Sequence, residues 1–562
     1  ATLAQAWLEK CGTKFRPVMT PMGTILVALA WTLLPCPTGA LHDATAQKHN
    51  ILYIVLDDLR PQIGAYGLKF MHTPHIDRLA AEGVLFEHAY SQIAICSPTR
   101  NSFLSGRMPD KTKTWNFVNH FREEDVGANW TALPEFFRKN GYFTTGAGKV
   151  YHGNHPPQFD DDKSWSEPWP GDFGACECGG HGFPPGGQAT CEGLDDSKTS
   201  CQDDDITRIV IDKLNMAANG TLGNGSQPWF IAAGLHKPHM SFYAKQEQFA
   251  LYPNPDPPAP LMPPKDMPYC AWHSCLSRAP GEDYSDWGNF TDIANDMTLT
   301  RPMNTATARR LRRGYYGSVT YADSNVGRIL AAAEPLLNDT VIMLVGDHGW
   351  SLGEQNVWCK MTNFENAVRV PLIVRAPWVQ AKSGMRVLAP VEQVDMYRTL
   401  ADLSGIGNDK VESGVDGKSL MPFMTNSASR SAQVGARSQF PRCYSALHDA
   451  TIPSNLPTLD RVDCQDIPRE KIDLMGYSLR TTAWRITEWR VWNGATLSAR
   501  WDLSPNATEL YYHGQDPLKT GSDPFATETE NVAGEPEHQT LLNELRVQLR
   551  EAFAVAQVDI VV

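Results

Sequence analysis

The chain has 562 residues, 42% of them hydrophobic and 20% charged, which predicts a large globular domain with a smaller one and excludes a fibrous or disordered protein. The formal net charge is −13, whereas proteins that bind nucleic acid normally carry an excess of basic residues, so we expect no nucleic-acid partner.

The first element in chain order is a short apolar run over residues 24–34, read TILVALAWTLL. It follows Met19 and Met22, either of which is a better translation start than the alanine at position 1, and small residues follow it up to Ala40. This pattern is typical of a signal peptide. A membrane anchor is the alternative, but the run is shorter than the roughly 20 apolar residues that span a bilayer. We expect a leader over residues 1–40, no stable membrane insertion, and a protein of the secretory pathway that is extracellular or lysosomal.

The next region alternates between strand-like and helix-like segments. The predicted strands are Ile51–Leu56, Phe230–Ala233, Val341–Val345 and Pro371–Val374. The predicted helices are His75–Glu82, Arg309–Glu334 and Val394–Ser404. This alternation predicts an α/β domain with a large parallel or mixed sheet flanked by helices. We place it at residues 41–452, with a surface insertion rich in Gly, Pro and Cys over Trp165–Ser200.

From about Gly476 the pattern changes to alternating, aromatic-rich segments. These are Tyr477–Thr482, Trp484–Trp492 and Leu510–Tyr512. They predict a small antiparallel sheet in a C-terminal subdomain over residues 453–562, which begins at a proline-rich loop around Pro453–Pro457.

Sequons and cysteines agree with secretion. The six N-x-S/T sequons are at Asn129, Asn219, Asn224, Asn289, Asn338 and Asn506. Of twelve cysteines, nine remain after Cys11 and Cys36 in the leader and Cys96 are set aside, so one thiol is expected to stay unpaired. We expect two local disulfides among Cys176, Cys178, Cys191 and Cys201, the pairs Cys270–Cys275 and Cys443–Cys464, and a free Cys359. Spacing alone leaves other pairings open.

Three predicted strands run directly into polar residues. They lead to Asp57-Asp58, to Asp347-His348-Gly349 and to His236-Lys237-Pro238-His239. Ligands of open α/β sheets lie beyond the carboxyl ends of the strands, so these side chains are expected to meet at one edge. Three carboxylates there would suit a hard divalent cation. Each group alone is more often a turn or a helix cap, but all three strand ends share the pattern.

A second motif is Cys96-Ser97-Pro98-Thr99-Arg100. Pro98 suits the first turn of a helix, which would place Cys96 at the helix N-terminus, where an anion is favoured. Arg100, one turn later, can donate two hydrogen bonds to the same anion. A buried structural cysteine is the commoner alternative, although the combined string is more specific than that.

This segment resembles the signature of the sulfatase family, of the alkaline-phosphatase-like superfamily, in which a formylglycine-generating enzyme converts the cysteine to formylglycine. Most members have Ser at the position of Thr99. The resemblance runs from about Asn50 to near Glu530, and within the family it is to the branch that acts on 2-O-sulfated uronic acids. The matching strings are 57–61, 103–107, 148–152, 236–239, 347–354, 438–442 and 475–480.

The resemblance implies a role for each of ten residues. Asp57, Asp58, Asp347 and His348, with the modified Cys96, would bind Ca²⁺, the usual metal of the family. His348 departs from the Asn of many members, and imidazole suits softer metals. Arg100 would hold formylglycine and the sulfate, Lys149 and His152 would position and deprotonate the aldehyde hydrate, and His236 and Lys360 would bind sulfate and protonate the leaving oxygen. Outside matched strings we would interpret Lys149, His152 and Lys360 as exposed or loop residues.

The implied reaction is hydrolysis of a sulfate monoester on a sulfated saccharide, with exo action on 2-O-sulfated uronic acid. A hydrated aldehyde has two hydroxyls on one carbon, so one can attack sulfur while the other later expels sulfate, which neither a thiol nor a serine can do. Two alternatives stay open. One is a phosphate or phosphonate monoester hydrolase of the same superfamily, and the other is an inactive glycan-binding protein.

Overall fold

The computed structural model describes residues 47–170, 190–192, 201–275, 297–379, 383–425, 435–445, 462–514 and 525–554. The expected leader, most of the Trp165–Ser200 insertion, Asn289 and the Pro453–Pro457 loop lie outside the described residues. No helix among the described residues is both long enough and apolar enough to cross a bilayer.

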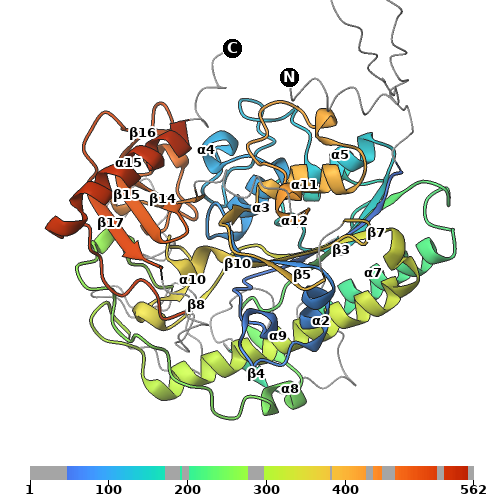
Figure 1. Ribbon diagram of the computed structural model, residues 1–562, viewed down its shortest axis with the longest axis horizontal. Coiled ribbons are helices and arrows are strands. Elements are labelled where there is room, and N and C mark those ends of the chain that lie inside the picture. The colour runs from blue at the N-terminus through green and yellow to red at the C-terminus, as the bar shows by residue number, and fades with distance from the viewer. Residues whose placement is uncertain are drawn as a thin grey trace, which may run out of the picture. The chain divides into compact units, whose positions relative to one another are not determined.

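A central eight-stranded sheet organises the main domain (Figure 1). Its strands run in the order β11-β2-β10-β7-β1-β5-β3, and β12 also pairs with β2. Their bounds are β1 Asn50–Leu56, β2 Val84–Tyr90, β3 Phe143–Gly148, β5 Trp229–Leu235, β7 Thr340–Gly346, β10 Arg369–Arg375, β11 Met385–Val387 and β12 Val391–Glu392. The sheet confirms all four predicted strands. Sequence patterns missed β2 and β3.

The sheet is mixed because one of its inner strands runs against the rest. Strands β1, β5, β7 and β3 are parallel, whereas β10 is antiparallel to both β7 and β2. A parallel connection needs a crossover, usually a helix that returns to the other end of the sheet. Between β7 and β10 the chain instead forms a small hairpin, β8 Ser351–Leu352 and β9 Trp358–Cys359, and then the short helix α10 Glu365–Val368. The chain therefore re-enters the sheet near the end at which it left.

Helices cover both faces of this sheet (Figure 1). One face packs on α2 Pro74–Glu82, α7 Gln202–Ala218 and α9 Thr305–Ala333. The other packs on α3 Cys96–Ser105, α5 Leu133–Lys139 and α11 Asp395–Leu403. Alternate residues of β1 point to the two sides, with Leu52 and Ile54 in one apolar cluster and Ile51 and Tyr53 in the other. The three predicted helices correspond to α2, α9 and α11.

The C-terminal sheet is antiparallel, as predicted. Its strands are β13 Ala436–Arg442, β14 Leu474–Arg480, β15 Trp484–Asn493 and β16 Ser498–Ala499, in that order, while β17 Ala507–Tyr512 pairs with β15. The helix α15 Gln539–Ala554 packs on it, with Phe553 against the ring of Tyr477. Strand β13 precedes the expected boundary at residue 453, so the sheet uses residues from both sides of that boundary.

The described disulfides correct part of the expected cysteine pairing. Cys443 pairs with Cys464, as expected. The Cys270–Cys275 pair and the free Cys359 were wrong, because Cys275 bonds Cys359 and Cys270 is a buried free thiol. Eighty-four residues separate Cys275 from Cys359, yet their Cα atoms are 6.0 Å apart, a proximity that spacing along the chain cannot reveal. Cys201 is disulfide-bonded, and Cys176 and Cys178 lie outside the described residues.

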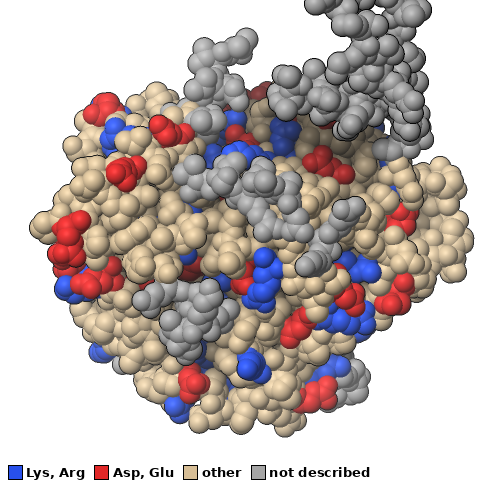
Figure 2. Space-filling view, viewed as in Figure 1, with Lys and Arg blue, Asp and Glu red and all other residues tan. Residues whose placement is uncertain are grey.

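Basic and acidic side chains are interspersed on the face drawn in Figure 2, among the residues that the structure describes. Charge on that face is therefore not separated into a basic and an acidic region. A cluster of charged side chains lies instead at the carboxyl ends of the central strands, where most of its members are buried.

Candidate active site

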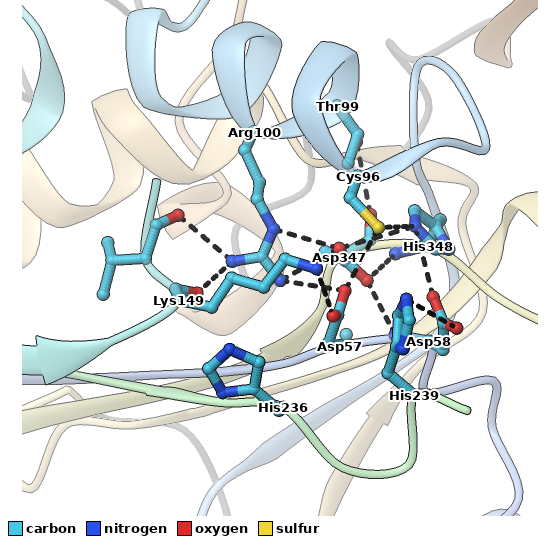
Figure 3. A network of polar contacts seen from close by, with 12 residues as sticks. Asp57, Asp58, Cys96, Thr99, Arg100, Lys149, His236, His239, Asp347 and His348 are labelled. Carbon is cyan, nitrogen blue, oxygen red and sulfur yellow. Dashed lines mark hydrogen bonds and ion pairs between the residues drawn. The ribbon is translucent and has the colours of Figure 1, made fainter. Parts of the chain in front are cut away.

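Five elements bring the predicted residues to one edge of the sheet (Figure 3). Strand β1 ends before Asp57 and Asp58, β7 before Asp347 and His348, β3 before Lys149 and β5 before His236. The helix α3 begins at Cys96, above these strand ends, and carries Arg100 in its second turn. The three polar strand ends and the helix start therefore converge, as the sequence predicted.

The three aspartates are fully buried and close together. Oδ1 of Asp347 accepts hydrogen bonds from the backbone N–H groups of Asp58, at 2.9 Å, and His348, at 2.8 Å. Burial raises the pKa of Asp347 to about 8, with the charge of Asp57 adding to the effect, and burial likewise raises that of Asp58 to about 6. Burial also opposes ionisation of Asp57, but Lys149 and His239 hold its pKa well below the ordinary value.

One oxygen of this cluster lacks a hydrogen-bond donor. Oδ2 of Asp58 is buried and accepts no hydrogen bond from the described residues. A buried carboxylate oxygen without a partner is costly, and a cation is one way to satisfy it. The residues present therefore fit a divalent metal. A set of four candidate ligand atoms from Asp57, Cys96, Asp347 and His348 lies within 4.8 Å of one another.

The ring of His348 is oriented to act as a ligand. Its Nδ1 lies 3.0 Å from the carbonyl oxygen of Gly349, which assigns the proton to Nδ1. Nε2 then presents a lone pair 3.4 Å from Oδ2 of Asp347 and 3.5 Å from Oδ1 of Asp58. Burial and the charge of Lys360 lower the pKa of His348 well below its ordinary value, so the ring is neutral. A histidine held by its other nitrogen is a common metal-ligand arrangement.

Cys96 lies at the centre of the site and is 2% exposed. Its Sγ is 3.4 Å from Oδ1 of Asp57, 3.3 Å from Nε2 of His348 and 3.0 Å from Nζ of Lys360. Burial raises the pKa of the thiol to about 12, and Asp57 adds to the effect. The unmodified side chain is therefore a neutral thiol at pH 7, and a neutral thiol is a poor nucleophile.

Three cations surround the aspartates, the buried Arg100 and Lys360 and the partly exposed Lys149. Nζ of Lys149 is 2.5 Å from Oδ2 of Asp57, and Nζ of Lys360 is 2.6 Å from Oδ1 of Asp58. The guanidinium of Arg100 lies 2.9 Å from Oδ2 of Asp347 and 3.3 Å from Oδ1 of Asp57. Burial disfavours each cation, but the carboxylates outweigh it and raise the pKa of all three. All three remain charged at neutral pH and can bind an anionic group.

The two histidines of the string after β5 have different neighbours. Nε2 of His236 contacts the side chain of Gln202 at 2.9 Å, and its Nδ1 lies 3.5 Å from Asp203, so the described contacts of its ring are with the start of α7. His239, three residues later, instead has its Nε2 4.0 Å from Oδ2 of Asp58 and belongs to a cluster with Asp57 and Cys96 (Figure 3). The sequence string contained both residues, but the turn after β5 decides which one reaches the aspartates.

His152 lies at the edge of the site. Its ring contacts Phe117, with centroids 4.9 Å apart, and its pKa is well below the ordinary value because of burial and the neighbouring charge of Lys149.

Thr99 has a hydroxyl, as does the serine that is usual at this position. The hydroxyl lies within hydrogen-bonding distance of two acceptors, the carbonyl oxygen of Asp347 at 3.2 Å and Oε1 of Gln393 at 3.0 Å. Gln393 also donates to the carbonyls of Gly346 and Asp347, a supporting role with no motif to reveal it.

Comparison with known proteins defines the class. The sulfatase family model matches residues 49–406, more than half of the chain. The chain therefore belongs to the sulfatase family and is a sulfuric ester hydrolase.

Among individual relatives, the chain is similar to human iduronate 2-sulfatase, at 31% identity over 90% of this chain and 96% of the relative. Two solved structures share the fold at 18% identity. A phosphonate monoester hydrolase from Agrobacterium radiobacter has a TM-score of 0.66 over 91% of this chain and 96% of its own. A 2-O GAG sulfatase has a TM-score of 0.60 over 91% and 93%.

Proposed function

We propose that this sulfatase removes sulfate from a 2-O-sulfated uronic acid at the end of a saccharide chain. The observation that carries the proposal is the placement of Cys96 among three buried aspartates, the buried Arg100 and Lys360, and the partly exposed Lys149. The similarity to human iduronate 2-sulfatase over nine-tenths of the chain supports the choice of sugar.

The nucleophile in this proposal is formylglycine, made from Cys96 by a formylglycine-generating enzyme. The thiol has a pKa near 12 in its buried site, so the unmodified residue would be almost entirely protonated at neutral pH. The hydrated aldehyde would supply two hydroxyls in its place. Cys96, Pro98 and Arg100 form the signature that the converting enzyme would recognise.

The proposed metal is one Ca²⁺ ion held by Asp57, Asp58, Asp347 and His348 together with the modified Cys96. The unsatisfied Oδ2 of Asp58 and the raised pKa of Asp58 and Asp347 support it, because a cation would favour ionised carboxylates at both positions. When bound, the ion would help to neutralise the sulfate group and favour deprotonation of the nucleophile.

The remaining residues handle charge and protons. Arg100, Lys149 and Lys360 would bind the sulfate and stabilise negative charge as the sulfur–oxygen bond breaks. His152, neutral because of its lowered pKa, would accept the proton of the hydrate. Lys360 and a histidine of the turn after β5 would contact the leaving oxygen, and one of the two would donate the single proton that it needs. We assign that histidine as His239, since the ring of His236 is bonded to Gln202.

A panel of defined sulfated disaccharides, together with aryl sulfate and aryl phosphate, tests the function. We expect turnover of aryl sulfate and the highest kcat/KM on a terminal 2-O-sulfated uronic acid. A preference for 6-O or N-sulfate would contradict the sugar assignment. A clear preference for aryl phosphate would indicate the phosphate or phosphonate hydrolase, and folded protein without turnover would indicate a glycan-binding protein.

We also propose that the protein matures in the secretory pathway. The two fully described disulfides and the exposed asparagines of five sequons support it, the five being Asn129, Asn219, Asn224, Asn338 and Asn506. Treatment of the expressed protein with N-glycosidase should lower its apparent mass. No change in mass, with all cysteines reduced, would contradict this route.

A further inference from the structure

The segment that carries Lys360 has an unusual backbone. Gln355, Asn356, Cys359 and Met361 all have positive φ, at 54°, 56°, 72° and 31°. Residues other than glycine rarely adopt this conformation, because it is energetically unfavourable for them. Lys360 lies between two of these residues, and its Nζ contacts Asp58 and Cys96. The strained segment therefore ends inside the active site.

Such a backbone persists only where its surroundings hold it in place. A neighbouring segment, Trp272–Cys275, provides much of that support, and we call it the 272–275 clamp. Nε1 of Trp272 donates to the carbonyl of Asn356 at 3.0 Å, and Oγ of Ser274 accepts from the backbone N–H of Trp358 at 3.1 Å. Both contacts fix the hairpin that leads to Lys360.

The third link of the clamp is covalent. Cys275 bonds Cys359, the residue directly before Lys360, and both cysteines are fully buried. On the other side of Lys360, the backbone N–H of Met361 donates to the carbonyl of Ala94 at 3.3 Å, close to the start of α3. The backbone around Lys360 is thus fixed on one side by the disulfide and on the other by the strand-to-helix connection that presents Cys96.

We infer that the 272–275 clamp, through the Cys275–Cys359 disulfide, is a positioning element for Lys360 in the sulfatase reaction. The disulfide at Cys359 restrains the backbone of the adjacent Lys360. The ammonium of Lys360 therefore stays between Asp58 and Cys96. Without the bond, the left-handed residues on each side can relax and move the ammonium. The inference rests on the proposed role of Lys360, and not on the identity of the sugar.

A double-mutant cycle on aryl sulfate tests it, with kcat and KM measured for wild type, Cys275→Ala/Cys359→Ala, Lys360→Met and the triple variant. We expect kcat of the cysteine double variant to fall by about tenfold to a hundredfold, because a displacement of about 1 Å has effects of that size, with KM changed less than about threefold. The triple variant should have the kcat of Lys360→Met alone. A merely structural disulfide would give additive losses, which would overturn the inference.

The controls separate this inference from the proposed function. Cys270→Ala removes a buried free thiol close to the clamp and should leave kcat unchanged. If Lys360→Met keeps wild-type kcat, the proposed role of Lys360 fails. If that variant is inactive and the cysteine double variant stays at wild-type kcat, only the positioning inference fails.

Two further measurements complete the test. Non-reducing peptide mapping should find Cys275 joined to Cys359, and a Cys270–Cys275 or Cys270–Cys359 peptide would overturn the inference. If the cysteine double variant does not fold, Ser274→Ala removes a noncovalent link of the clamp. It should lower kcat severalfold in wild type and leave kcat unchanged in Lys360→Met, whereas equal losses in both backgrounds would overturn the inference.

Discussion

Two buried clusters of charge in this protein have similar residues but opposite electrostatics. One is the aspartate cluster of the active site. The other joins Glu365, Glu528 and His513 near the C-terminal sheet, where three candidate ligand atoms also lie within 4.8 Å of one another. By residue type and spacing alone, both are candidate metal sites. Their hydrogen bonds distinguish them.

In the second cluster each carboxylate oxygen has a donor. Arg485 contacts Glu365 and Glu528 at 2.6 Å, Arg480 donates to Glu365 at 3.2 Å, and Tyr90 to its other oxygen at 2.9 Å. Burial opposes ionisation, but the arginines outweigh it and lower the pKa of both glutamates. The protein's own donors satisfy the carboxylates of this cluster, which therefore has a structural role.

In the active site burial instead raises the pKa of Asp58 and Asp347, the charge of Asp57 adds to both effects, and Oδ2 of Asp58 has no donor among the described residues. A buried carboxylate oxygen without a hydrogen-bond donor can instead be satisfied by a bound cation. The comparison indicates that unmet hydrogen bonding, rather than the presence of acids and histidines, marks the functional site.

The largest effect should come from Cys96→Ser. A serine has one hydroxyl and cannot expel sulfate in the second step, so multiple turnover should fall by about 10³-fold or more while the fold is retained. Steady-state assays on aryl sulfate and circular dichroism measure the two properties. Substantial multiple turnover by this variant would refute the two-hydroxyl mechanism.

Glu365→Gln tests the other side of the comparison. Loss of this charge leaves Arg480 and Arg485 buried with one carboxylate fewer, so the free energy of unfolding should fall by about 3–5 kcal/mol. The response of activity to Ca²⁺ and to chelators should stay as in wild type. Denaturant unfolding and chelator titrations measure both, and an altered Ca²⁺ requirement would show that this cluster also binds the metal.

The affinity for Ca²⁺ should rise with pH. In the metal-free protein, burial places the pKa of Asp58 near 6 and that of Asp347 near 8, above the value of about 3.9 in an unfolded chain. Their contribution to stability is therefore present below about pH 4 and is lost progressively as pH rises from about 4 to about 6 for Asp58 and to about 8 for Asp347, and a bound cation offsets that loss. Binding releases protons, so affinity should increase by up to about tenfold per pH unit between pH 5.5 and 7.5. Calorimetric titration of metal-free protein in that range would show it, and a pH-independent affinity would contradict it.

The smallest effect should come from Thr99→Ser. Serine keeps the hydroxyl that reaches the carbonyl of Asp347 and Gln393, so conversion of Cys96 and kcat should each stay within about twofold of wild type. Peptide mass spectrometry and kinetics measure them. Thr99→Val is the matched control, because it keeps the shape and removes the hydroxyl; equal behaviour of the two variants would show that the hydrogen bond is unimportant.

Much of the site follows from local patterns. Apolar runs that end in Asp57-Asp58 and Asp347-His348 predicted where the aspartates meet, because strand ends of one sheet share an edge. The proline in the string after Cys96 predicted the start of α3. Both signals lie within a few residues of the side chain concerned.

What escaped prediction depends on the path of the chain between elements. The turn after β5 places His239, and not His236, beside Asp58, and a hairpin far away in sequence pairs Cys275 with Cys359. The antiparallel direction of β10 likewise follows from the short route around residues 347–368. None of these has a periodic or compositional signal.

Under the proposed conversion of Cys96 to formylglycine, the burial of α3 limits when that conversion could take place. All ten residues from Cys96 to Ser105 are buried in the folded chain. A modifying enzyme would have to hold the cysteine and its following residues in its own cleft, so the proposed conversion would have to come before this helix packs. A molecule that folds first would keep its thiol. The specific activity of a preparation would then depend on how fast Cys96 is oxidised relative to how fast the chain folds in the cell that made it.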